Sequence, residues 1–383
     1  MEYVRFGELY SNSSSNGLSR PSAVRGKGFR MIGMGELFAH NIIHDMEMER
    51  VLMNDKEQAK FFVEEGDLLF ARQSLVASGA GKCSIVSSLS ENTTFESHLI
   101  RVRLDKAKCN PLYYFYLFQL PYNPIKAIVN QCAQAGIRGS ELCKVKVQKP
   151  DIKVQNKVAS ILSKYDTLIE NNTKRIRILE KMAENLYKEW FVRFRFPGYE
   201  KVEMENGLPK GWKVKRYEDE LNVKYGKGLP TNRLTEDGFP VFGSNGQIGF
   251  YTSYMYDTPQ ILISCRGASS GVVNISLPKS FVTNNSLVCE LTDKTESVFE
   301  YLKYYFLNTN LVQYQTGSAQ PQITINNVVK LKMLVPSHEV QCAFSKKIRV
   351  IDKEVANLQN QNSLLARQRD LLLPRLMSGK LDI

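Results

Sequence analysis

The stretch Pro150-Asp151-Ile152-Lys153-Val154-Gln155 aligns without a gap to Pro336-Ser337-His338-Glu339-Val340-Gln341, 186 residues farther along the chain. The same offset relates Ala133-Gln134 to Ala319-Gln320, Ile137 to Ile323, Lys144 to Lys330 and Asp166 to Asp352. Self-similarity over such a distance indicates two structural units of the same kind. A length of 383 residues is enough for two domains.

Upstream of this stretch, each half carries the same order of predicted elements. Residues 66–72 resemble 259–266, and 99–104 resemble 286–291; these short apolar runs are typical of buried strands. Residues 4–9 likewise resemble the segment that begins at Val214. Aromatic-rich helical stretches follow at 111–119 and 298–308. Their rings could stack on bases, but aromatic side chains at helical spacing favour a core. We therefore predict an α+β protein with mixed α/β domains at 1–150 and 197–336, each followed by a long helix, at 151–196 and 337–383.

Each predicted long helix carries an apolar seam of seven-residue repeats. The seam positions are Val158, Leu162, Tyr165, Ile169, Asn172, Ile176, Leu179, Ala183, Leu186 and Trp190, then Phe344, Ile348, Ile351, Val355, Leu358, Asn362, Leu365, Arg369, Leu372 and Leu376. A seam of more than four heptads indicates a coiled coil. Its length of about 48 Å exceeds the width of a small domain, which disfavours the alternative that each helix only caps its own domain.

Because a whole domain separates the two helices, we predict that they pair antiparallel and give the chain an internal pseudo-two-fold repeat. With the helix ends aligned, Asn172 faces Asn362. Two facing asparagines in an apolar seam cost stability but fix the register.

The charge balance favours a polyanionic partner. Lys and Arg number 51 against 39 Asp and Glu, a net charge of +12 spread along the chain. Basic side chains bind nucleic-acid phosphates with release of counterions, so we expect double-stranded DNA as a partner. The seven cysteines include no C-x-x-C pair, which predicts reduced thiols. No run of about 18 apolar residues occurs, so we expect no membrane segment and a cytoplasmic protein.

Sequence motifs for catalysis are absent. The chain has no Asn-Pro-Pro-Tyr or Asp-Pro-Pro-Tyr tetrad of amino-methyltransferases and no G-x-x-x-x-G-K-[ST] phosphate loop. Asp151 lacks the following Glu-x-Lys of a nuclease metal site. His40 and His44, near Glu36 and Asp45, could place two metal ligands on one helix, but no further ligand completes the set, which favours surface histidines. We predict no catalytic residue and no metal site on this chain.

A family resemblance rests on the domain-helix-domain-helix order and on four segments, residues 161–166, 239–246, 317–323 and 336–341. The chain resembles, over nearly its full length, the specificity subunits of type I restriction-modification enzymes. The resemblance implies that each domain is a target recognition domain for one half of a bipartite DNA site, and that the coiled coil sets the spacer. It also implies that the helices dock two methyltransferase subunits and, through them, motor and nuclease subunits. S-Adenosylmethionine, ATP and magnesium would be bound by those partners, and this chain would bind no cofactor.

The two halves of the chain differ in sequence within the segments that resemble the family. The second half has Pro321-Gln322 after Ala319-Gln320, whereas the first has Ala135-Gly136 after Ala133-Gln134. Just before Gln155 the first half also lacks the acidic residue usual in the family. The two domains are therefore expected to differ in target.

Side chains that contact DNA are expected in loops near the strands, where Arg can hold guanine and Asn can hold adenine. In the first domain the candidates are Arg20, Arg25, Lys27, Arg30, Arg72 and Lys82. In the second domain they are Lys224, Lys227, Arg233, Asn245 and Arg266. The alternative function is a coiled-coil scaffold that bridges proteins without touching DNA. Salt-sensitive binding to random duplexes would distinguish the two.

Overall fold

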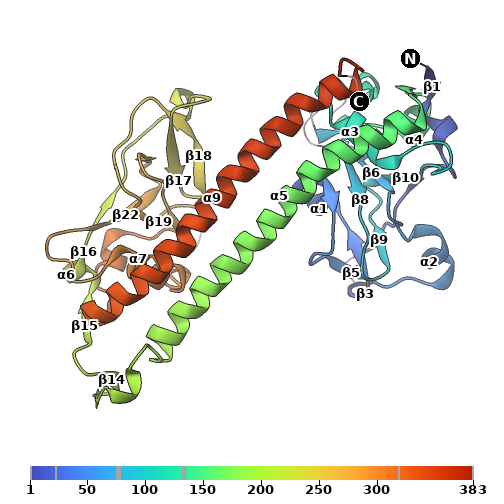
Figure 1. The fold of residues 1–383 in the computed structure, drawn as a ribbon. Coiled ribbons are helices and arrows are strands. Elements are labelled where there is room, and N and C mark those ends of the chain that lie inside the picture. The colour runs from blue at the N-terminus through green and yellow to red at the C-terminus, as the bar shows by residue number, and fades with distance from the viewer. Residues whose placement is uncertain (1, 22–23, 75–78, 131–134, 318–319, 382–383) are drawn as a thin grey trace. The chain divides into compact units, whose positions relative to one another are not determined.

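The computed structural model describes residues 2–21, 24–74, 79–130, 135–317 and 320–381 (Figure 1). The chain divides into two compact units, Met1–Asn171 with Gln361–Ile383, and Asn172–Asn360. Each unit therefore contains one globular domain together with parts of both long helices. Three residues of the repeat, Ala133, Gln134 and Ala319, lie outside the described residues, as does Ser318 of the segment 317–323.

The two predicted long helices are present. Helix α5 spans Ile152–Tyr187 over 36 residues and continues into a π-helical turn at Lys188–Val192. Helix α9 spans His338–Met377 over 40 residues. Neither contains a glycine, and their one proline, Pro374, lies close to the end of α9, so little in either sequence interrupts the helical hydrogen bonds.

The coiled-coil prediction is confirmed within each unit. None of the twenty predicted seam side chains is exposed. In the first unit, Leu162 near the start of α5 shares a core with Leu376 near the end of α9. In the second unit, Tyr187 near the end of α5 packs against Phe344 near the start of α9, with ring centroids 6.4 Å apart. The two helices are therefore antiparallel (Figure 1). Asn172 and Asn362 belong to different units, and their pairing stays a prediction.

The first domain contains a five-stranded sheet in the order β2-β10-β6-β8-β4 and a three-stranded sheet in the order β5-β3-β9. Two antiparallel pairs, β1 with β12 and β7 with β11, complete it. The strands are β1 (Tyr3–Arg5), β2 (Ser15–Asn16), β3 (Arg25–Ile32), β4 (Ile42–Ile43), β5 (Glu49–Val51), β6 (Leu68–Ala71), β7 (Gln73–Ser74), β8 (Cys83–Val86), β9 (Thr93–Phe95), β10 (Leu99–Val102), β11 (Ala135–Gly136) and β12 (Lys146–Gln148). The helices are α1 (Met34–Ala39), α2 (Asp55–Phe61), α3 (Pro111–Gln119) and α4 (Gly139–Leu142).

The second domain repeats this plan. A four-stranded sheet has the order β16-β22-β19-β20, a three-stranded sheet has the order β18-β17-β21, and β15 pairs with β23. In both three-stranded sheets the central strand has one parallel and one antiparallel neighbour. The strands are β13 (Met204–Glu205), β14 (Leu208–Pro209), β15 (Lys213–Arg216), β16 (Leu221–Tyr225), β17 (Phe239–Gly243), β18 (Gly246–Tyr251), β19 (Ile261–Ser264), β20 (Val273–Ile275), β21 (Phe281–Val282), β22 (Ser286–Leu291) and β23 (Lys332–Val335). The helices are α6 (Tyr217–Glu220), α7 (Phe299–Leu307) and α8 (Ile325–Val328).

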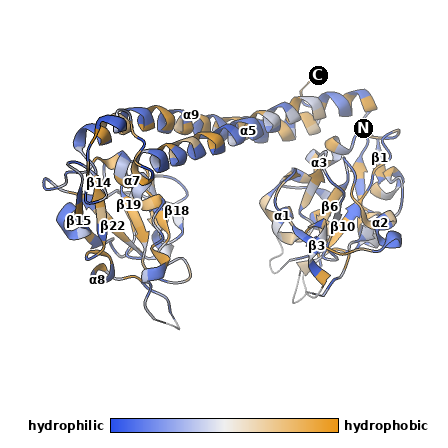
Figure 2. Ribbon diagram, turned by 90° about the horizontal axis from the view of Figure 1, so that it is seen from below, coloured by the Kyte–Doolittle hydropathy of each residue, from blue (hydrophilic) through white to orange (hydrophobic). Residues whose placement is uncertain are grey.

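The aromatic-rich helices α3 and α7 belong to the cores, as predicted. All six residues Tyr113–Phe118 of α3 are buried among apolar strands and the start of α5. In α7, Tyr301 and Phe306 are fully buried. Hydrophobic residues run along the strands of both domains, while much of α5 and α9 is hydrophilic (Figure 2). These rings are therefore unavailable for stacking on bases.

One buried glutamine fixes each domain to the start of a long helix. Gln155 accepts a hydrogen bond from the backbone N–H of Asn110 at 2.9 Å and donates one to the carbonyl of Pro150 at 2.8 Å. Gln341 makes the same two bonds, from Val298 N–H at 2.9 Å and to Pro336 at 2.8 Å. Both side chains are 0% exposed. The last residue of the repeated stretch is therefore the link between domain and helix.

The suggested pair of metal ligands on one helix is wrong. Helix α1 ends at Ala39, before His40, and β4 ends directly before His44. His44 instead faces Glu170, with 3.3 Å between Nε2 and Oε2. Within the described parts of the chain, no three His, Cys, Asp or Glu side chains are grouped so as to hold a metal. No helix in those parts is both long and apolar enough to cross a membrane.

Candidate nucleic-acid interface

Five loops of the second domain are joined by hydrogen bonds to backbone carbonyls at one end of its strands. Lys227, after β16, accepts a hydrogen bond at its carbonyl from Asn284 N–H at 3.1 Å. Cys265, after β19, donates to the carbonyl of Asn285 at 3.0 Å and accepts from Ile323 N–H at 3.1 Å. The turn between β17 and β18 joins the group through the hydrogen bond from the Ser264 hydroxyl to the Ser244 carbonyl. We call the side chains carried by these loops the second rim: Lys227, Asn245, Arg266, Asn284, Asn285 and Gln322.

The second rim combines cations and amides with no carboxylate. All of its side chains are exposed except Asn284, which is half-buried. No Asp or Glu occurs in residues 225–235, 243–249, 264–272, 282–288 or 309–329, which include the five loops. Arg and Lys donate hydrogen bonds only, and Asn and Gln both donate and accept. Such a surface suits the phosphates and base edges of a nucleic acid.

The first domain has an equivalent set of loops. Gly17 and Gly226 both lie where an added Cβ would collide with backbone carbonyls, those of Phe95 and Glu96 in one case and of Val282 and Thr283 in the other. The next residues also match, because Leu18 pairs in parallel with Glu96 as Lys227 pairs with Thr283.

Hydrogen bonds extend this match to the loop after β6. Arg72 N–H donates to the carbonyl of His98 at 2.8 Å, as Cys265 donates to Asn285. Arg72 is therefore the counterpart of Cys265. Gln73, which pairs with Gly136, is the counterpart of Arg266, which pairs with Gln322. We call Leu18, Gln73, Glu96, His98 and Gly136 the first rim.

Three predicted DNA-contacting arginines of the first domain are held by carboxylates. Arg20 forms an ion pair with Glu57. Arg25 lies 2.9 Å from Glu49. Arg30 lies 2.7 Å from Asp45 and also contacts Glu91.

The pKa values of two of these carboxyl groups are lowered. Hydrogen bonds from Ser90 and Arg30 lower the pKa of Asp45, and hydrogen bonds from Arg50 and Arg30 with their positive charges lower the pKa of Glu91. The three arginines therefore already have anionic partners.

The other candidates of the first domain differ among themselves. Lys27 is exposed at a bulge in β3 and forms no ion pair with any described residue. Arg72 donates to the carbonyl of Ser97 at 3.4 Å, close to the limit for a hydrogen bond. Lys82 donates to the carbonyl of Phe38 at 2.6 Å, and its burial lowers its pKa.

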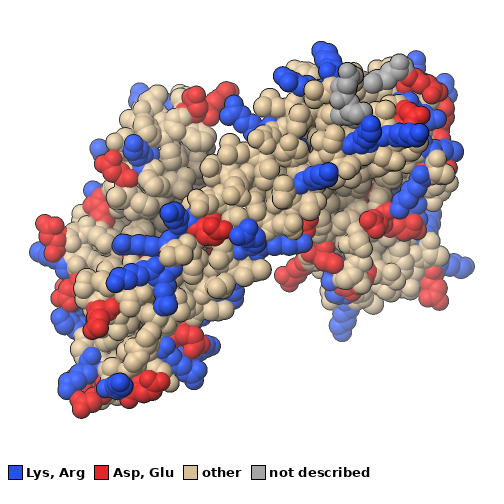
Figure 3. Space-filling model, viewed as in Figure 1, with Lys and Arg blue, Asp and Glu red and all other residues tan. Residues whose placement is uncertain are grey.

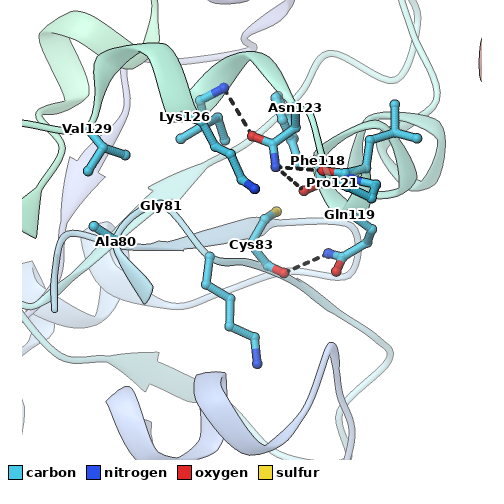
Figure 4. Close-up of a pocket in the computed structure, with 12 residues that line it drawn as sticks. Ala80, Gly81, Cys83, Phe118, Gln119, Pro121, Asn123, Lys126 and Val129 are labelled. Atoms are coloured by element: carbon cyan, nitrogen blue, oxygen red, sulfur yellow. Dashed lines mark hydrogen bonds between the residues drawn. The ribbon is translucent and has the colours of Figure 1, made fainter. Parts of the chain in front are cut away.

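Lys82 also lines a pocket of about 420 Å³ beside the end of α3. Figure 4 shows Gln119 bonded to the carbonyl of Cys83, and Asn123 bonded to the carbonyl of Phe118. These amides are occupied by the protein's own backbone.

Most candidates of the second domain are available to a ligand. Lys227, Arg233, Asn245 and Arg266 are exposed, and within the described residues none of their side chains pairs with a carboxylate. Lys224 is the exception, because it lies 2.6 Å from Glu290. The sequence prediction did not include Asn284, Asn285 or Gln322. The sequence feature that could have identified these residues is the absence of acidic residues from loops rich in Asn and Gln.

The rest of the charged surface is mixed. On the face shown in Figure 3, Lys and Arg are scattered among Asp and Glu over both units, without a continuous basic patch. Net charge alone therefore does not locate an interface on this face.

Comparison with known proteins agrees with the repeat. The family model described as the type I restriction modification DNA specificity domain matches twice, at residues 27–181 and 209–366. The MjaIX specificity subunit of a type I restriction enzyme from Methanocaldococcus jannaschii is 28% identical, over 71% of this chain and 69% of that protein. The crystal structure of the S subunit of a type I restriction-modification system from M. genitalium has the same fold. Its TM-score is 0.58 at 16% identity, and the match covers 98% of this chain and 95% of that one. The chain therefore belongs to the family of type I restriction-modification specificity subunits.

Proposed function

We propose that this chain is the DNA-reading subunit of a type I restriction-modification complex, in which each domain binds one half of a bipartite duplex site. The observation that carries the proposal is the duplicated anchor. Gln155 and Gln341 fix the same kind of domain to the start of each of two antiparallel helices. A protein with two equivalent readers related by approximate two-fold symmetry would read two half-sites, and the helices between the readers would set their separation.

Exposed apolar side chains on the long helices favour a second role, as the docking surface for methyltransferase subunits. On α9, Val350, Leu364 and Leu371 are 69%, 51% and 62% exposed and are spaced by multiples of seven residues. On α5, Ile178 and Met182 are 60% and 54% exposed. Apolar residues that repeat on the outer face of a helix are typical of a protein contact. Motor and nuclease subunits would join through those methyltransferase subunits.

We assign the chemistry to those partners. This chain lacks the sequence motifs that bind ATP or transfer a methyl group to an amino nitrogen. S-Adenosylmethionine, ATP and magnesium would accordingly be bound by the methyltransferase and motor subunits.

Genome-wide mapping of methylated adenines, in cells with and without this gene, tests the proposal. Deletion is expected to remove methylation from one bipartite motif. An unchanged pattern in cells whose methyltransferase partner is active would contradict it. The scaffold alternative makes a separate prediction, because a scaffold would show no salt-sensitive binding to random duplexes in a filter assay.

A further inference from the structure

We propose that the second rim reads a half-site that contains guanine and adenine, with Arg266 on guanine and the amides of Asn285 and Gln322 on adenine. This inference rests on the proposed DNA-reading function and adds the class of base that the second domain contacts. The first rim, whose side chains differ at every equivalent position, would read a different half-site.

The three residues lie on adjacent segments of backbone. Arg266 and Gln322 are paired directly across an antiparallel bridge. Residues opposite each other in such a bridge point to the same face, with Cβ atoms roughly 5 Å apart. Asn285 is joined to the residue before Arg266 by the 3.0 Å hydrogen bond from Cys265 N–H. The guanidinium and the two amides therefore project from adjacent backbone positions.

The backbone that carries these side chains is rigidly held. Cys265 and Ile323, beside Arg266 and Gln322, are each only 1% exposed, and Ser286 after Asn285 is 0% exposed. The Ser286 hydroxyl donates to the carbonyl of Gly243 at 3.1 Å. A backbone that is already fixed loses little freedom on binding, so only the side chains have to be ordered, which favours specific contacts over adaptable ones.

The chemistry of the rim selects the bases. A guanidinium can donate two hydrogen bonds to O6 and N7 of guanine, and a side-chain amide can pair with N6 and N7 of adenine. The cytosine amine is typically recognised by a carboxylate, and the five loops of the second rim contain no Asp or Glu. The neighbouring cation Lys227 has no such geometry and is suited to a phosphate.

The first rim lacks this set. The counterparts of Arg266, Gln322 and Asn285 are Gln73, Gly136 and His98. The carboxylate of Glu96 stands at the position of Thr283 and accepts a hydrogen bond from Met34 N–H at 2.5 Å. The first rim therefore has no arginine where the second has Arg266, and it gains an acidic group.

The experiment is selection of bound sequences by the full chain from a duplex library randomised in two segments. The wild-type chain is expected to select a bipartite motif with fixed guanine and adenine in one half. Arg266→Lys keeps the charge but loses the planar fork, so preference for guanine at one position should fall by about 5- to 150-fold, the range expected for one bidentate contact. Asn285→Ala should relax an adenine in the same half. Gln73→Ala, at the equivalent place in the first domain, should leave that half unchanged.

The outcomes separate the two proposals. If the wild-type chain selects no bipartite motif, the proposed function fails and this inference fails with it. If it selects one but Arg266→Lys and Asn285→Ala retain both halves unaltered, only the assignment to the second rim is overturned. A selected motif without fixed guanine and adenine in the affected half would overturn the assignment of bases. Arg266 and Asn285 are exposed, so equal melting temperatures of wild type and variants serve as the folding control.

Discussion

Gly17 in the first domain and Gly226 in the second occupy the same place, and each allows its own backbone to pass close to two backbone carbonyls. The residues after them differ in kind. Leu18 is 6% exposed and belongs to an apolar cluster, whereas Lys227 projects into solvent. The pattern holds around both sets of loops, where hydrogen bonds between backbone atoms recur and side chains do not. The two domains therefore share the backbone hydrogen bonds of these loops and differ in the side chains that the loops carry.

Three predicted DNA-contacting cations of each domain also differ in their partners. In the first, Arg20, Arg25 and Arg30 are bound to carboxylates of their own domain. In the second, Lys227, Arg233 and Arg266 have no anionic partner among the described residues. A cation that is already paired gains less from a phosphate, because the existing contact must first be broken. The difference suggests that the second domain supplies more of the electrostatic affinity for DNA.

The largest expected effect tests whether the two buried glutamines stabilise their domains equally. Gln155→Leu and Gln341→Leu each remove two hydrogen bonds and so deprive one backbone N–H and one backbone carbonyl of the glutamine that bonds them. Each is expected to lower the free energy of unfolding by about 2 to 4 kcal/mol. Urea unfolding measures both, and Gln359→Leu, at an exposed position of α9, is the control. Costs that differ by much more than about 1 kcal/mol would show that the two anchors are not equivalent.

The next effect tests the contrast in cations. Replacing Lys227, Arg233 and Arg266 together by Ala should reduce the slope of log K against log salt by about 2 to 3, since each lost phosphate contact is worth roughly 0.9. The matched variant replaces Arg20, Arg25 and Arg30 by Ala and should change the slope by less than about 1. Filter binding to random duplexes over a range of salt gives both slopes. Equal reductions would remove the proposed difference between the domains.

Much of the fold was predictable from sequence, because the repeat contains the same apolar runs and the same helical seam twice. The repeated glutamines were visible too, but their role depends on Asn110 and Val298, which lie more than forty residues upstream. The candidate interface was less predictable. Nothing near Arg30 in sequence shows that Asp45 and Glu91 will reach it, because those contacts depend on how the chain returns to β3.

A substitution with a smaller expected effect would make the cations of the first domain resemble those of the second. Glu91→Gln releases Arg30 and Arg50 from one shared carboxylate. Affinity for random duplexes should rise a few-fold at low salt, and the salt slope should increase by about 1, because one more cation becomes available to phosphate. Glu47→Gln is the control, since it removes the same charge from an exposed residue that forms no ion pair with the described residues. An equal rise in both variants would assign the effect to net charge instead of to the released arginines.

The smallest effect concerns pH. The pKa values of Asp45, Glu57 and Glu91 are all lowered, chiefly by hydrogen bonds from Ser90, Asn54 and Arg50 respectively. A carboxyl group whose pKa is lower in the folded state stabilises the fold above its unfolded pKa, and this contribution is lost as pH falls through the folded pKa. The three groups should therefore leave stability unchanged between about pH 8 and pH 5 and reduce it below about pH 4. None of the three is buried, so the reduction should be slight. Melting temperature against pH measures it, and Glu91→Gln should flatten the acid side of the curve. A wild-type melting temperature that fell between pH 8 and pH 5 and levelled off below pH 4 would contradict the role of these pairs.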